Sequence, residues 1–114
     1  MFSTNFIAAT REFSDYGVHI PAPYFRKSFA PRSEVKSARL TVCGLGFYEL
    51  YVNGRRITKG LLAPYISNPD DILYYDEYDI TDLLQGGKNV LGLLLGNGML
   101  NCPGGAVWDF QLVP

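Results

Sequence analysis

The feature that most constrains the fold is the run from Phe47 to Val52, which leads directly into Asn53-Gly54. The run is rich in aromatic residues, which pack well on the pleated surface of a strand. Asn-Gly is the strongest short-range signal of a β-hairpin, because both central residues of a type I′ turn need positive φ and these two adopt it at least cost. We therefore predict antiparallel strands and seek the function on the surface of a β-sandwich.

Further segments between turn signals predict the other elements. Residues 89–95 are apolar on both faces, which is typical of a central strand covered on two sides. One short helical turn is expected near residues 81–85, capped by Asp79 or Thr81 and ended by Gly86-Gly87. A turn is expected at residues 31–34. The remaining predicted strands are residues 24–29, 38–42, 55–58, 72–78 and 107–113.

Short strands separated by turn signals predict an all-β sandwich or jelly roll. We divide the chain into an irregular N-terminal segment, residues 1–22, and a β-sandwich module, residues 23–114. The net charge of −1 offers no electrostatic footprint for nucleic acid, and no run approaches the roughly 18 apolar residues that span a bilayer. We expect neither nucleic acid nor a membrane as partner. The N-terminus shows no secretory signal, and the compartment stays open.

The sequence shows no self-contained active site. His19 is the only histidine, which excludes sites with several histidine ligands. Glu77 and Asp79 would lie about 7 Å apart on one strand face, within the range of paired catalytic carboxylates. We interpret them instead as a solvated strand residue and a helix cap. No cofactor is expected, although a structural calcium ion bound by Asp70 or Asp71 is compatible with the sequence. Cys43 and Cys102 are interpreted as free thiols, because two cysteines are too few for a disulfide scaffold.

The eight tyrosines, seven phenylalanines and single tryptophan leave two interpretations open. A sugar ring stacks its apolar face on an aromatic side chain, while amides and carboxylates bind its hydroxyl groups. The alternative is that the rings fill the core or an interface with a neighbouring domain, and composition alone favours this alternative.

Several motifs stand in an order and spacing that can be compared with known families. They occupy residues 23–29, 38–40, 44–54, 62–64, 78–84 and 95–99, followed by the paired glycines 104 and 105. Together they resemble the N-terminal β-sandwich module of bacterial α-L-rhamnosidases, over most of residues 22–110. The resemblance implies an incomplete jelly-roll fold similar to galactose-binding-like domains. It departs at Met99 and Leu100, where the family often has an aromatic residue, and the chain stops before the family's module does.

The resemblance also implies a function. In that family a large helical barrel, absent here, holds the acidic catalytic residues, so we expect this chain alone not to be an enzyme. The module would assist recognition of rhamnose-containing glycans or brace the catalytic barrel. A purely structural or interaction domain without sugar affinity and an autonomous lectin are the alternatives. If the module binds sugar, the expected residues are Tyr65, Asn68, Asp70, Asn97 and Trp108, with the two aromatics stacking.

An incomplete sandwich leaves a strand edge and apolar inner surface without a partner. We therefore expect self-association of the chain, through edge pairing or through exchange of the predicted strand at residues 107–113.

Overall fold

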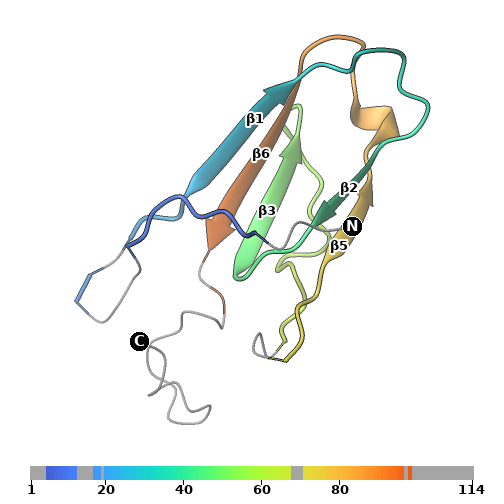
Figure 1. Cartoon of the computed structure of the whole chain (residues 1–114). Helices are drawn as coiled ribbons and strands as arrows, with labels where there is room; N and C mark the ends of the chain where they lie inside the picture. The colour runs from blue at the N-terminus through green and yellow to red at the C-terminus, as the bar shows by residue number, and fades with distance from the viewer. Residues whose placement is uncertain (1–4, 13–16, 19, 68–70, 97, 99–114) are drawn as a thin grey trace.

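The computed structural model contains two antiparallel β-sheets that share one core (Figure 1). It describes residues 5–12, 17–18, 20–67, 71–96 and 98. The larger sheet has the strand order β1-β6-β3-β4, and the smaller sheet pairs β2 with β5. The strands are β1 (Tyr24–Phe29), β2 (Arg39–Val42), β3 (Phe47–Val52), β4 (Arg55–Arg56), β5 (Asp76–Asp79) and β6 (Asn89–Gly96). This arrangement confirms the predicted all-β sandwich.

The hairpin after β3 forms as the Asn-Gly pair predicts. Asn53 has φ 49° and Gly54 has φ 81°, so both central residues of the turn adopt the left-handed region. Beyond the turn, Arg55 and Arg56 pair with Val52 and Tyr51. The strand predicted over residues 55–58 is shorter than expected, although the backbone N–H of Ile57 still donates to the carbonyl of Leu50 at 2.9 Å.

Strand β6 is the centre of the larger sheet. It pairs with β1 over residues 24–29 and with β3 over residues 47–52, both antiparallel. Its place between two partner strands confirms that it is a central strand of the sheet. Leu91, Leu93 and Leu95 lie opposite Val52, Leu50 and Tyr48, so these two rows share the inner face of the sheet.

The core lies between the two sheets. Along β3 every second residue is buried. These residues pack with Tyr78 of β5 and with Ile80, which follows β5. Exposure of the buried set ranges from 1 to 5%; its members are Tyr48, Leu50, Val52, Ala63, Tyr78 and Ile80.

The strand predicted from residue 72 is wrong over residues 72–75. β5 begins at Asp76, which pairs with Val42, the last residue of β2. β2 ends at Val42 because the chain bends at Leu45 and Gly46, so residues 72–75 have no strand to pair with. Their side chains are exposed as a result.

The predicted helical turn is a short 3-10 helix, η1 (Thr81–Leu83). Ile80 holds the position before it, and no side chain caps it, so the expected cap by Asp79 or Thr81 is wrong. Asp79 instead accepts hydrogen bonds from the backbone N–H and the hydroxyl of Thr81, at 3.0 and 2.6 Å. The Thr81 hydroxyl oxygen in turn accepts from the backbone N–H of Ala38, which extends the β2–β5 pairing by side-chain contact.

The described residues between 5 and 22 lie outside helices and strands. The strand predicted over residues 107–113 falls outside the described residues. In the described part of the chain, no helix has both the length and the hydropathy needed to cross a bilayer.

Candidate functional site

Exposed apolar side chains gather in the chain between β4 and β5. Eight large hydrophobic residues there are between 39 and 85% exposed, and we call this set the 61–75 patch. Its members are Leu61, Leu62, Tyr65, Ile66, Ile72, Leu73, Tyr74 and Tyr75. Exposed apolar side chains scattered singly need no explanation, but a group of this kind marks an interaction surface.

The patch is anchored to the core at Ala63. This residue is 2% exposed, and its carbonyl accepts a hydrogen bond from the backbone N–H of Tyr48 at 2.8 Å. The bridge fixes the chain between Leu62 and Pro64 against the edge of β3. The buried Ala63 thus fixes this part of the chain, while the neighbouring side chains remain exposed at the surface.

A shallow hollow adjoins the patch. It lies between residues 44–47, residues 64–67, Leu73 and Tyr74, and its volume is about 40 Å³. The rings of Tyr65 and Tyr74 meet edge to face, with centroids 6.0 Å apart and an interplanar angle of 87°. Such a volume is far below the roughly 300–1,000 Å³ typical of small-molecule sites, so the hollow cannot enclose a sugar ring.

Glycine is required at the floor of this hollow. A Cβ on Gly46 would lie 2.5 Å from the carbonyl oxygen of Gly96, and a Cβ on Gly98 would lie 2.8 Å from the Cα of Gly46. Two backbone segments therefore approach each other closely where β3 begins and β6 ends.

The sequence-predicted sugar residues are only partly placed by the structure. Tyr65 is 81% exposed and belongs to the 61–75 patch. Asn68, Asp70, Asn97 and Trp108 lie outside the described residues, so their grouping stays a prediction. Tyr74, the ring partner of Tyr65, was counted among the aromatic residues, but nothing in a single sequence shows that two loop positions nine residues apart meet.

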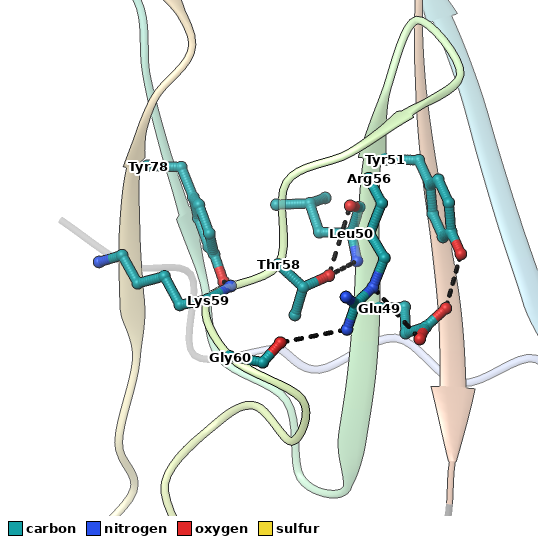
Figure 2. Close-up of polar contacts among 8 residues, drawn as sticks. All are labelled: Glu49, Leu50, Tyr51, Arg56, Thr58, Lys59, Gly60 and Tyr78. Atoms are coloured by element: carbon teal, nitrogen blue, oxygen red, sulfur yellow. Dashed lines mark hydrogen bonds and ion pairs between the residues drawn. The ribbon is translucent and has the colours of Figure 1, made fainter.

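A polar chain crosses the core between the two sheets. The Tyr48 hydroxyl donates to the Asp76 carboxylate at 2.5 Å and lies 2.9 Å from the Tyr78 hydroxyl. The Tyr78 oxygen accepts from the backbone N–H of Lys59 at 3.3 Å, and the Lys59 ammonium lies 5.2 Å from the centre of the Tyr78 ring (Figure 2). Burial, followed by the hydrogen bond to Asp76, raises the pKa of Tyr48 well above its usual range. Tyr48 therefore stays a neutral hydrogen-bond donor at ordinary pH.

The outer face of the larger sheet carries a second polar group. Glu49 accepts from the Tyr51 hydroxyl at 2.6 Å, and its other oxygen lies 3.3 Å from Nε of Arg56 (Figure 2). Arg56 also donates to the carbonyl of Gly60 at 3.1 Å. The hydrogen bond to Glu49 is the main cause that raises the pKa of Tyr51. These contacts brace β3 against β4 and give each oxygen of the Glu49 carboxylate one partner.

Glu77 and Asp79, the carboxylates at catalytic spacing, have separate local partners. Glu77 lies 3.9 Å from Arg39 across the smaller sheet, and both side chains are largely exposed. Two hydrogen bonds from Thr81 hold the pKa of Asp79 below its usual range. The exposure of Glu77 agrees with its interpretation as a solvated strand residue, whereas Asp79 binds Thr81 without capping η1. In the described ranges no cluster of three or more His, Cys, Asp or Glu residues could hold a metal ion, and the calcium site at Asp70 or Asp71 stays a prediction.

The fold and these surfaces define a class, an antiparallel β-sandwich module with an exposed apolar loop surface. Residues 33–110 match the family described as the alpha-L-rhamnosidase N-terminal domain, and the chain belongs to that family. The resemblance drawn from the motifs is thereby confirmed.

Relatives of known name agree with this assignment. An alpha-L-rhamnosidase of Formosa agariphila is 46% identical over 77 residues, which is 68% of this chain and 8% of the relative. The structure of alpha-L-rhamnosidase from Dictyoglomus thermophilum matches with a TM-score of 0.66 and 43% identity, over 69% of this chain and 9% of that one. That of the Streptomyces avermitilis alpha-L-rhamnosidase complexed with L-rhamnose matches with a TM-score of 0.60 and 35% identity, over 65% and 7%. The chain thus spans less than a tenth of the length of these relatives.

Proposed function

We propose that this chain acts as a non-catalytic module of an α-L-rhamnosidase-like glycoside hydrolase and that it braces the catalytic helical-barrel domain of that enzyme. The parent enzyme would act on rhamnose-containing glycans. The single observation that carries the bracing role is the 61–75 patch, whose eight large apolar side chains are 39 to 85% exposed. Covering them against another domain would remove apolar surface from water at about 25 cal/mol per Å².

Bracing fits the local geometry better than sugar binding at the same surface. The hollow beside Tyr65 has a volume of about 40 Å³, and the ring of Tyr74 already meets the Tyr65 ring edge to face. Leu61 and Leu62, at 85 and 64% exposed, carry no group that could bind a hydroxyl. An apolar protein surface suits such a patch more closely than a sugar does.

A chimeric enzyme tests the bracing role. This chain would replace the matching segment of the Dictyoglomus thermophilum rhamnosidase, to which it is 43% identical. We expect Leu62→Asp combined with Tyr65→Asp to lower the Tm of the chimera's catalytic part, because two charges would face its apolar surface. The isolated 114-residue chain should keep its Tm with the same changes, since both side chains are exposed in it.

Ile7→Asp is the matched control. Ile7 is 77% exposed and lies outside the family match at residues 33–110, so its change should leave the chimera's Tm unaltered. A chimera that tolerates the double patch variant as well as it tolerates the control would contradict the bracing role.

A further inference from the structure

The Asn53-Gly54 turn carries a chemical reactivity of its own. In an Asn-Gly pair the backbone nitrogen of the glycine can attack the side-chain carbonyl carbon of the asparagine, because glycine has no Cβ to shield that nitrogen. Asparagine is accordingly one of the thermolabile residues of proteins. Gly54 is exposed, and a Cβ built on it would meet no atom within 4 Å. The attacking residue therefore lies in solvent at the tip of the hairpin.

The side-chain amide of Asn53 is fully engaged in the folded chain. Its nitrogen donates to the carbonyl of Leu83 and to the side-chain oxygen of Asn89, both at 2.8 Å. Its oxygen accepts from the backbone N–H of Val90, also at 2.8 Å. Attack by the glycine nitrogen would expel the amide nitrogen, which makes two of these hydrogen bonds. The native contacts therefore stabilise the intact amide and oppose the reaction.

The partners of this amide are themselves fixed. Asn89 has an exposure of 0%, accepts from the backbone N–H of Gln85 at 2.7 Å and donates to the carbonyl of Gly87 at 2.9 Å. The backbone N–H of Asn53 donates to the carbonyl of Val90 at 2.8 Å, so Asn53 is tied to β6 through main chain and side chain together. The amide is released only when the hairpin separates from β6 and from the loop after η1.

We propose that Asn53 is a latent deamidation site, closed in the folded chain and opened when the contact between the hairpin and β6 breaks. The Gly54 nitrogen then gives up its proton and bonds to the side-chain carbonyl carbon of Asn53, while the amide nitrogen takes up a proton and leaves as ammonia. Water opens the resulting succinimide at either of its two carbonyl carbons, which yields aspartate or isoaspartate at position 53. Water is the only co-reactant, and the site is independent of the bracing role.

Neither product fits the native turn. A carboxylate at position 53 places an oxygen acceptor where Asn53 donates, against the Leu83 carbonyl and the Asn89 side-chain oxygen. Acceptors that face one another without a proton between them destabilise a half-buried site. Isoaspartate also adds a carbon to the main chain of a turn whose two central residues have φ 49° and 81°. Modification therefore makes a transient opening of the hairpin permanent.

Incubation of the full chain at neutral pH, native and in guanidinium chloride, tests the site. Trypsin cleaves after Arg39, Arg55 and Lys88, so Asn53 and the second Asn-Gly pair, residues 97–98, fall on different peptides. Mass spectrometry of the separated aspartyl and isoaspartyl peptides gives each rate, and the second pair supplies the intrinsic rate in denaturant. Folding should slow the reaction at Asn53 about a hundredfold or more, because the reaction follows the small open population. A native rate equal to the denatured rate would overturn the proposal.

Asn89→Ala distinguishes local release of the amide from unfolding of the whole chain. Tyr48→Phe is the matched control, because it removes a hydrogen bond to Asp76 in the core, away from the turn. Urea is added so that both variants have the same free energy of unfolding. Asn89→Ala should then deamidate at Asn53 about tenfold faster than the control, because one acceptor of the amide is gone. Equal rates would show that only global unfolding opens the site and would overturn its local control.

Asn53→Asp tests whether the fold rejects the product. Asn53→Gly is its control, since glycine also removes the amide donors but adds no charge and accepts the positive φ. In urea unfolding at neutral pH, the ratio of folded to unfolded chain should be about tenfold lower for Asn53→Asp than for Asn53→Gly. An aspartate variant at least as stable as the glycine control would show that the turn accepts the product, and the permanent opening would be disproved.

Discussion

The side-chain amide of Asn53, in the turn after β3, donates to the side-chain carbonyl of Asn89, at the start of β6, with 2.8 Å between nitrogen and oxygen. The backbone N–H of Val90 donates to the other end of the Asn53 amide, also at 2.8 Å. Asn89 further donates to the carbonyl of Gly87 at 2.9 Å. This pair of amides, of which Asn89 is buried, therefore connects the hairpin, the central strand and the loop after η1.

Removal of the Asn89 amide should be costly. Asn89→Ala leaves the backbone groups of Gln85 and the carbonyl of Gly87 without this partner. It also removes one hydrogen bond of the Asn53 amide, which keeps its bonds to Leu83 and Val90. We expect the free energy of unfolding to fall by about 3 kcal/mol, because unsatisfied buried polar groups each cost about 1–3 kcal/mol. Urea unfolding at neutral pH measures this, with the exposed neighbour Lys88→Ala as control. An Asn89→Ala midpoint equal to that of the control would refute the role of the network.

A pair of changes at Asn53 separates backbone conformation from hydrogen bonding. Glycine at this position loses the side-chain hydrogen bonds but adopts the φ of 49° at little cost. Alanine loses the same bonds and must also adopt this left-handed conformation, which is unfavourable for a residue with a Cβ. Asn53→Ala should therefore be about 1–2 kcal/mol less stable than Asn53→Gly in the same urea experiment. Equal stabilities would mean that the turn changes its conformation when the amide is lost.

These contacts show what the sequence alone could and could not predict. The hairpin was predictable because Asn53-Gly54 is a local signal. The bond between Asn53 and Asn89 spans 36 residues and leaves no trace in periodicity or composition. Residues 72–75 have the pattern of a strand, but strand formation depends on a partner of sufficient length, and β2 stops at Val42. Asp76 lies two residues before Tyr78, which places it on the inner face of β5, and no role was predicted for it from the sequence.

The candidate surfaces likewise include residues that the sequence could predict and features that it could not. Tyr65 was predicted as a ring that stacks on a sugar; it is exposed, and the stacking stays a prediction. The cleft between residues 31–35 and residues 81–86 was not predicted, because residues 31–34 give only a turn signal. Its other wall depends on how the buried Asn89 positions Gln85. Turn signals and residue types can be recognised in the sequence, whereas a concave surface built from segments some fifty residues apart exists only after folding.

Alkaline unfolding should report on Tyr48. Because the folded-state pKa of this hydroxyl is raised above its unfolded value of about 10, the neutral form is favoured in the native protein. The stability from this hydroxyl is fully present below about pH 10 and is lost as the pH rises above that value. Tyr48→Phe should lower stability at neutral pH by about 1–3 kcal/mol, since Asp76 loses its donor, and should flatten the alkaline decline.

Urea midpoints between pH 8 and 11 measure that decline. Tyr24→Phe, at a tyrosine 70% exposed on β1, is the control and should keep the slope of the unmodified chain. Parallel curves for Tyr48→Phe and the unmodified chain would show that Tyr48 does not govern alkaline unfolding.

Asp79 should contribute to the pH dependence of stability in acid. Hydrogen bonds from Thr81 lower its folded-state pKa below the unfolded value, so its contribution is present above about pH 4 and is lost as the pH falls through the depressed pKa. Asp79→Asn should make the loss of stability in acid shallower, with Glu77→Gln on the same strand face as the comparison. The measurement is thermal unfolding between pH 2 and 6, and an acid slope steeper than or equal to that of the unmodified chain would disprove the role of Asp79.

The chain alone should not hydrolyse an aryl α-L-rhamnoside. Glu49, Glu77 and Asp79 each have a structural partner. Release of nitrophenol from 4-nitrophenyl α-L-rhamnoside should equal the buffer blank, while a full-length rhamnosidase assayed in parallel gives turnover. Hydrolysis that copurifies with the chain and disappears in Glu49→Gln would overturn the non-catalytic assignment.

Self-association of the isolated chain is expected through the 61–75 patch rather than through the edge of the larger sheet. β1 is outermost in that sheet, but its exposed Arg26 and Lys27 oppose pairing with a second copy, as charged side chains do at natural sheet edges. The eight members of the patch are leucine, isoleucine and tyrosine side chains, none of them charged. Light scattering should show a mass that rises with concentration.

Leu61→Asp combined with Leu62→Asp should shift that equilibrium toward monomer, because association would then bury two unpaired charges. Ile7→Asp adds a charge at an equally exposed apolar residue outside the patch and should associate as the unmodified chain does. If the double variant keeps the concentration dependence of the control, the contact lies elsewhere, and pairing at the β1 edge becomes the better account. A monomer at high micromolar concentration in the unmodified chain would exclude both routes.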